Sequence, residues 1–336
     1  MNVPNRLQRW RDWFPVPYES GRPWIVRWVL LDANRNAVTA ALVSIVYASI
    51  MLVGTVYTFE MRRLLTETGA VQTLLNTLLG GIILLVSIVV SINSIVLSYD
   101  ITSLSNQEER IGGVMEFRQR ISRLSDQRER PTDPASFLDM MAGVIRSRTE
   151  ALKEVAEGAD QELAEEIEEY VDSITETANR IDEPSSGPEF SVIWLGLEVD
   201  YSPHMDRSRS IKTSYGSSID DDFEDRLDDL VEAFQLFATG KEYFKTLYYT
   251  EEVSQLSRTL LVVSLPAIVV TAVTVLAIDA QLLPDVWVLG LPPLLSFVAT
   301  AFTIALVPFL VLTSYTLRLA TVARRTAGSG PFSLET

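Results

Sequence analysis

The sequence predicts an all-α integral membrane protein with four transmembrane helices and a helical cytosolic domain inserted between helices 2 and 3. Four runs of 19 to 25 residues carry no charged side chain. At a rise of about 1.5 Å per residue, each run can cross a hydrocarbon core of ~30 Å. Between the second and third runs lies an acidic stretch whose apolar residues recur at helical spacing. The predicted spans are residues 37–59, 74–98, 260–278 and 291–315.

Residues 1–36, which precede the first span, combine tryptophan with arginine. Both side-chain types favour the headgroup zone of a bilayer, so this segment is predicted to be an interfacial anchor. A lipid-sensing or gating element is the alternative. The anchoring residues are Trp10, Trp13, Trp24 and Trp28.

The first span has small residues on one helical face, spaced four, three and four residues apart. They are Ala37, Ala41, Ser44 and Ala48. Small residues at this spacing let helices approach closely, so the face is predicted to be a packing seam.

Basic residues set the expected orientation. Arginines precede the first span and follow the last, whereas the connection over 279–290 has none. The bias places both termini in the cytoplasm of a multi-pass plasma-membrane protein. Residues 99–257, and a short tail over 318–336, are then cytosolic as well.

The second span carries a polar stripe. Its serines recur at intervals of four, three and four, and an asparagine and Gly80 continue the same face. Such a face can line a water-filled path, or it can let helices pack and hydrogen-bond; the sequence leaves both open. The pore-lining candidates are Asn76, Ser87, Ser91, Ser94 and Ser98.

The cytosolic stretch is predicted to be mostly helical. The second span is expected to continue as a stalk through 111–124. Asp133 and Pro134 predict the start of a helix over 134–156, followed by another over 163–181. Residues 202–218 are predicted to be irregular. A helix resumes near Ile219, with Gly240 as its C-cap or a kink.

The third and fourth spans, within residues 258–317, each contain one proline, Pro266 and Pro308. Proline removes a backbone hydrogen bond, and membrane helices tolerate it. We expect these two positions to be hinges.

Charge is unevenly distributed. Residues 100–257 contain 36 acidic and 16 basic side chains, whereas the whole chain has a net charge of −16. Only four of the 28 basic residues are lysine. Acidity with arginine in place of lysine is typical of proteins from a cytoplasm of molar salt, so the acidic residues are interpreted as a solvated surface.

Catalytic patterns are nearly absent. The chain has no cysteine and a single histidine, His204, which is expected to be exposed. No phosphate loop or nucleophile elbow is found, so neither an enzyme, a cofactor nor a metal site is expected. The run Asp220–Asp222 is interpreted as the acidic first turn of a helix. None of the four spans contains a charged residue, which argues against pumps and voltage sensors.

The layout of four spans, cytoplasmic termini and a helical cytosolic region between spans two and three resembles that of bestrophin-type anion channels. That resemblance implies a second span that lines the pore, here through Ser87, Ser91, Ser94 and Ser98. It concerns layout and not motifs. The stretch Glu242–Tyr248 also resembles segments of uncharacterised four-span proteins from salt-loving archaea.

These observations predict an oligomeric ion channel or pore whose second span lines the path. The alternative is a non-conducting scaffold or sensor whose acidic cytosolic domain recruits a protein partner. The expected partners are the lipid bilayer and further copies of the chain, and no nucleic acid is expected.

Overall fold

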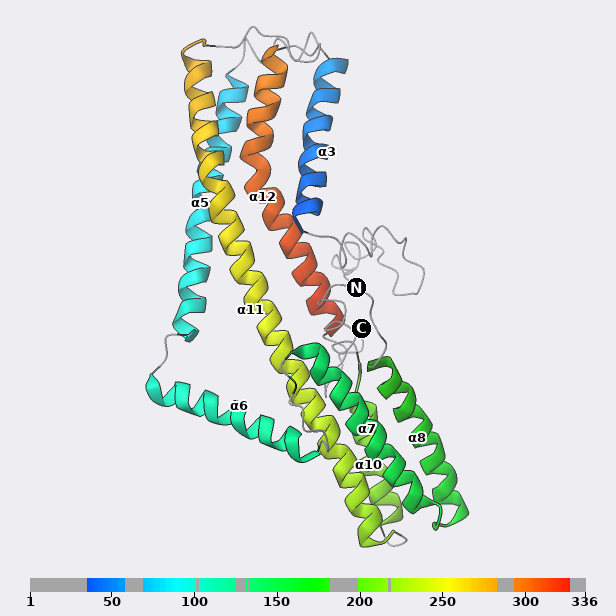
Figure 1. Cartoon of the computed structure of the whole chain (residues 1–336). Helices are drawn as coiled ribbons and strands as arrows, with labels where there is room; N and C mark the ends of the chain where they lie inside the picture. The colour runs from blue at the N-terminus through cyan, green and yellow to red at the C-terminus, as the bar shows by residue number, and fades with distance from the viewer. Residues whose placement is uncertain are drawn as a thin grey trace, which may run out of the picture.

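The computed structural model describes residues 35–57, 69–100, 103–124, 131, 133–181, 199–216, 219–282 and 293–326. These residues form eight α-helices and no strand, which confirms the all-helical prediction. Four of the helices are long and apolar enough to cross a membrane. Figure 1 shows an upper layer made of these four and a lower bundle beneath it, with α11 running through both.

The upper layer consists of α3 (Arg35–Val56), α5 (Ala70–Asp100), the later part of α11 (Asp221–Asp279) and α12 (Pro293–Thr326). Helix α12 contacts all three of the others, and α11 contacts α5 as well. Small residues allow these close approaches. Gly54 of α3 lies against the side chain of Leu295, and Gly81 of α5 lies against the ring of Phe309.

The small-residue face of α3 does not pack against the other described helices. Ala37, Ala41, Ser44 and Ala48 are all exposed. Helix α3 instead packs on α12 through Met51 and Gly54. The face is therefore not a seam between the described helices of this chain, and it remains available to lipid or another molecule; a packing seam there stays a prediction.

The lower bundle consists of α7 (Pro134–Ala156), α8 (Gln161–Ile181), α10 (Ser202–Tyr215) and the first half of α11. The start of α7 is confirmed, because the Ser136 amide donates to Asp133 Oδ1 over 2.9 Å. The acidic first turn of α11 is confirmed too, with Asp220 accepting from the Phe223 amide. Residues 202–215 are helical, so the prediction of an irregular segment is wrong; Ile211 anchors α10 in the core.

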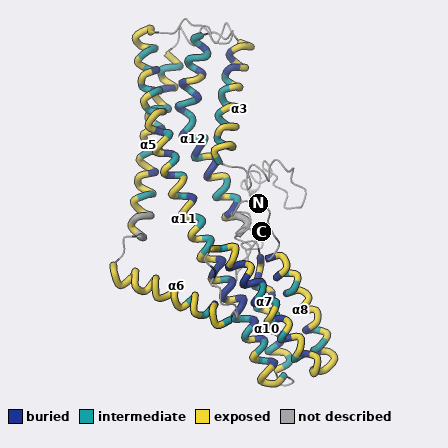
Figure 2. The backbone as a smooth tube through the Cα atoms, viewed as in Figure 1, coloured by how far each residue is buried: buried dark blue, intermediate teal, exposed yellow. Residues whose placement is uncertain are grey.

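Helix α6 (Leu104–Leu124) does not continue α5 as a stalk. Figure 1 shows it crossing sideways from the lower end of α5 to the bundle. Its later residues reach the core, where Ile121 is buried and Phe117 packs on it, whereas its first half is exposed (Figure 2). The apolar spacing correctly predicted a helix. The apolar residues of that helix pack onto α11 and α7.

Helix α11 is continuous over 59 residues, about 88 Å at 1.5 Å per residue. Gly240 lies in the interior of this helix, so the prediction of a C-cap is wrong, and a kink there stays a prediction. The glycine is needed because the Phe137 ring of α7 occupies the space of a β-carbon. Pro266 and Pro308 likewise lie inside α-helices that continue on both sides of them; a hinge at either stays a prediction.

Gly240→Ala is expected to destabilise the protein, because the added methyl group overlaps the Phe137 ring. Overpacking of this kind amounts to about 1–3 kcal/mol, which outweighs the gain of up to ~1 kcal/mol in helix propensity. Thermal unfolding followed by circular dichroism measures the effect. Gly143→Ala on α7, where a β-carbon meets nothing within 4 Å, is the matched control and should raise the Tm. A Tm for Gly240→Ala at or above that of the parent would contradict the contact.

Candidate functional site

The serine face of α5, made of Asn76, Ser87, Ser91, Ser94 and Ser98, is exposed along its whole length. Helix α5 packs on α11 and α12 through the opposite side, where Leu75, Ile82 and Val89 are buried. No described helix of the chain covers the serine face. It is therefore not a seam between the four described apolar helices.

Each serine hydroxyl donates to the backbone of its own helix. Ser91 Oγ donates to the Ser87 carbonyl and Ser94 Oγ to the Val90 carbonyl, both over 3.0 Å. Ser87 and Ser98 make equivalent bonds. A hydroxyl that donates inward keeps its lone pairs for an outside partner. The face thus presents a row of oxygen acceptors on an otherwise apolar helix.

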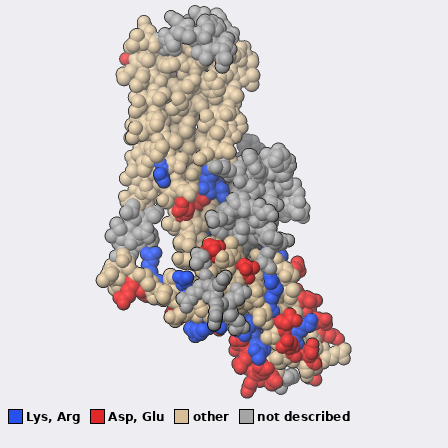
Figure 3. Space-filling view, viewed as in Figure 1, with Lys and Arg blue, Asp and Glu red and all other residues tan. Residues whose placement is uncertain are grey.

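A charged layer marks the lower end of the apolar helices. It consists of Arg35, Glu252, Arg258 and Arg318. The Arg35 guanidinium forms an ion pair with Glu252, whose side chain is 4% exposed, and lies 5.1 Å from the centre of the Tyr315 ring. Arg318 and Tyr248 interact with the same carboxylate. These contacts join α3, α11 and α12, and Figure 3 shows charged side chains of both signs at the lower end of the apolar upper layer.

Lys241 is buried in the lower bundle, nineteen positions before the apolar run of α11 begins at Leu260. Its Nζ donates to the Val199 carbonyl over 2.8 Å and lies 5.5 Å from the centre of the Tyr201 ring. Burial lowers the pKa of this amine from 10.5 to about 8. Because α11 supplies the amine and the segment before α10 supplies its acceptor, Lys241 fixes the two together.

The expectation that His204 is exposed is wrong. Its ring is buried, stacked on Phe234 with 5.3 Å between centroids, and its Nε2 lies 2.8 Å from Thr177 Oγ1. Burial lowers the pKa of the imidazole. The Tyr170 hydroxyl donates to the His204 carbonyl and lies 2.5 Å from Ser208 Oγ. These polar groups form hydrogen bonds with one another inside the core and join α8 to α10.

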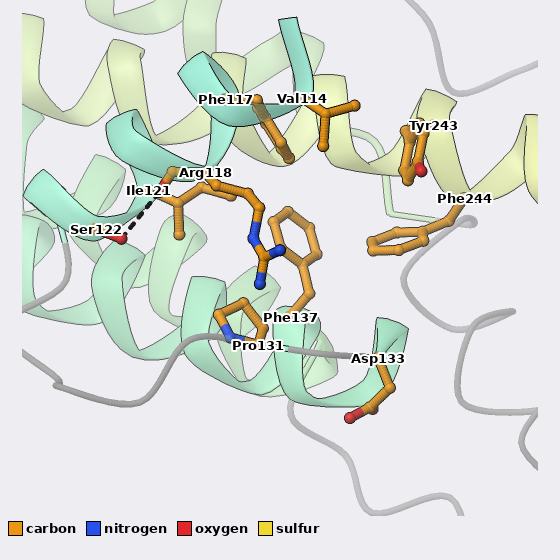
Figure 4. A pocket seen from close by; sticks show the side chains of 10 residues that line it. All are labelled: Val114, Phe117, Arg118, Ile121, Ser122, Pro131, Asp133, Phe137, Tyr243 and Phe244. Carbon is orange, nitrogen blue, oxygen red and sulfur yellow. Dashed lines mark hydrogen bonds between the residues drawn. The ribbon is translucent and has the colours of Figure 1, made fainter. Parts of the chain in front are cut away.

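An apolar pocket of about 290 Å³ lies between α6, α7 and α11. Aromatic side chains form much of its wall, including Phe137 and Phe244, whose centroids are 5.2 Å apart. Figure 4 shows the Arg118 guanidinium extending across it beside Pro131. The pocket is a concave apolar surface on the lower half of the molecule, next to the exposed part of α6.

The structure does not describe one group of predicted residues, the interfacial anchors. The anchors Trp10, Trp13, Trp24 and Trp28 lie outside the described residues. Within the described ranges, no group of three or more histidine or acidic side chains is placed to hold a metal ion. Lys241 was missed by sequence reasoning. It stands among other charged and aromatic residues that read as surface, and only the fold reveals its burial.

Comparison with known proteins places the chain in a family. Residues 18–336 match the model of a family of unknown function, DUF7972. The chain belongs to that family. No curated protein and no solved structure matches it. Membership in DUF7972 brings no activity with it, so the resemblance to bestrophin-type channels stays a prediction that concerns layout.

Lys241→Met is expected to change how the stability of this DUF7972 protein depends on pH. Below pH 8 the buried amine is protonated in both the folded and unfolded states, and its burial penalty is about 3 kcal/mol. As pH rises from about 8 toward 10.5, the folded state loses the proton first and the penalty disappears. The Tm of the parent relative to that of Lys241→Met should therefore be higher at pH 9.5 than at pH 8.

Lys245→Met is the matched control, because it removes a lysine one turn away that pairs with Glu242 near the surface. Thermal unfolding in one detergent at both pH values measures all three proteins. Parallel Tm changes for the parent and Lys241→Met would contradict the burial of a titrating amine.

Proposed function

We propose that this protein is an oligomeric ion channel in which α5 lines the conduction path. The observation that carries the proposal is the uncovered serine face, which lies opposite the packed side of α5. Polar side chains on a membrane helix favour a water-filled path or another protein over lipid. A ring of copies with α5 innermost provides both, because each serine face then borders the axis.

The surroundings of the serine face support conduction. Hydroxyl oxygens whose protons are donated to the helix backbone can accept hydrogen bonds from water or contact a passing cation. Leu84 lies on the edge of the same face, near the middle of the helix, and is 63% exposed. An apolar side chain between polar ones narrows and dries a path, as hydrophobic constrictions in channels do.

Orientation follows from the charged layer. Arginine at the lower ends of α3, α11 and α12, with no basic residue in the connection over 279–290, favours a cytoplasmic lower bundle. The protein is then a multi-pass plasma-membrane protein. Its acidic, lysine-poor lower bundle suits a cytoplasm of high salt, where a Debye length of ~3 Å at 1 M removes long-range repulsion.

The scaffold hypothesis has one observation in its favour. Helix α6 exposes Leu104, Ile111 and Met115, and the pocket beside it has an apolar wall. Apolar surface of this kind is typical of a binding site for a partner helix. It competes with the channel proposal because a recruiting protein needs no path through α5.

Single cysteines along α5 distinguish the two, since the chain has no cysteine of its own. Gly80→Cys and Ser87→Cys, which lie on the serine face above the charged layer, should react with a membrane-impermeant thiol reagent in intact membranes, because their face borders water within the bilayer. Leu85→Cys and Val89→Cys, which point into the packed side, are the matched controls and should stay unreacted. Absence of labelling at both positions, with efficient labelling after detergent unfolding, would contradict a water-filled path and favour the scaffold.

A further inference from the structure

The lower part of α5 is longer than the bilayer requires. Leu85 and Val89 pack in one cluster with Leu260 and Tyr315, and Tyr315 is the ring beneath Arg35. Val89 therefore lies at the charged layer. Helix α5 continues for eleven residues beyond it to Asp100, about 16 Å at 1.5 Å per residue.

Apolar side chains on this extension are exposed. Val90 is 51% exposed and Ile95 is 59% exposed, and Figure 2 shows the lower part of α5 as an uncovered helix. Neighbouring α11 at this depth carries Glu251 and Glu252, which marks water or headgroups and not hydrocarbon. Lipid chains that cover the apolar residues higher on α5 do not reach here, so protein must cover them.

A second copy of the chain fits this surface better than other partners. The extension over 90–98 carries no charge, whereas the lower bundle beside it is strongly acidic, as the outer face of α8 illustrates (Figure 3). Copies can pack through this uncharged helix without removing acidic side chains from water. The spacing of four, three and four along α5 is also the spacing by which identical parallel helices pack.

We infer that the lower part of α5 packs against the same segment of neighbouring copies, forming a parallel helical neck beneath the bilayer. This inference rests on the proposed channel assembly. At 100° per residue, Val90 lies on one flank of the serine face and Ile95 on the other. One flank of each copy meets the opposite flank of the next, a heterologous contact that closes into a ring. Ser91, Ser94 and Ser98 border its axis.

Disulfide crosslinking tests the neck. The full chain with Val90→Cys and Ile95→Cys together should form a ladder of covalent multimers when membranes are oxidised with copper phenanthroline, because the two flanks meet between copies. A chain with Glu165→Cys and Asp172→Cys on the outer face of α8 is the matched two-cysteine control and should remain monomeric. A ladder no stronger than that of the control, with thiols still reactive toward maleimide, overturns the inference.

The second measurement is the assembled mass of a variant that carries a charge on the flank of Ile95. Ile95→Asp should reduce the assembled mass in detergent, measured by light scattering, to that of a monomer, whereas Ser173→Asp on α8 should leave it unchanged. Equal assembled masses, or a monomeric parent protein, overturn the neck. Crosslinking decides the matter even where Ile95→Asp fails to fold.

Ion flux separates this inference from the proposed function. Crosslinked multimers in liposomes that remain sealed to ions confirm the neck and contradict the channel. Ion flux without crosslinks confirms a channel and contradicts the neck, because the copies then meet elsewhere.

Discussion

The continuity of α11 is the constraint on which the rest of the structure depends. One helix of 59 residues packs with α5 and α12 in the upper layer and with α7, α10 and α6 in the lower bundle. Two contacts hold it at the transition between them. Phe137 fills the space above Gly240, and Arg35 pairs with Glu252. Helix α11 therefore joins the upper layer and the lower bundle as one uninterrupted element.

A second constraint concerns coverage. Apolar surface on a membrane protein is stable only where lipid or protein lies against it. Lipid suffices for the upper layer, down to the charged layer of Arg35, Glu252, Arg258 and Arg318. It does not account for α5, whose polar face points outward within the bilayer and whose apolar flanks continue below it. Both features have one explanation in an assembly of copies around α5, and that explanation unites the proposed channel with the neck.

Local signals in the sequence were sufficient for much of the fold. Uncharged runs predict the apolar helices because bilayer thickness sets their length, and Asp133 with Pro134 predicts a helix start because capping involves only neighbours. The predictions that were wrong concern residues whose environment is set by contacts with distant parts of the chain. Gly240 has the local character of a cap, yet Phe137 from another helix explains it. His204 and Lys241 stand in polar surroundings in the sequence and are buried by residues far along the chain. For the candidate site, the spacing of the serines predicted the polar stripe on α5. Its exposure could not be predicted from the sequence, because it depends on how the other helices pack against α5.

The central claim is that ions pass along the serine face of α5. Ion flux through liposomes that carry the Ser91→Cys protein, recorded before and after a water-soluble thiol reagent, tests it most directly. We expect flux that the reagent blocks in Ser91→Cys and leaves intact in the cysteine-free parent. Liposomes that stay sealed with folded protein inserted, or flux through Ser91→Cys that the reagent does not change, would contradict it.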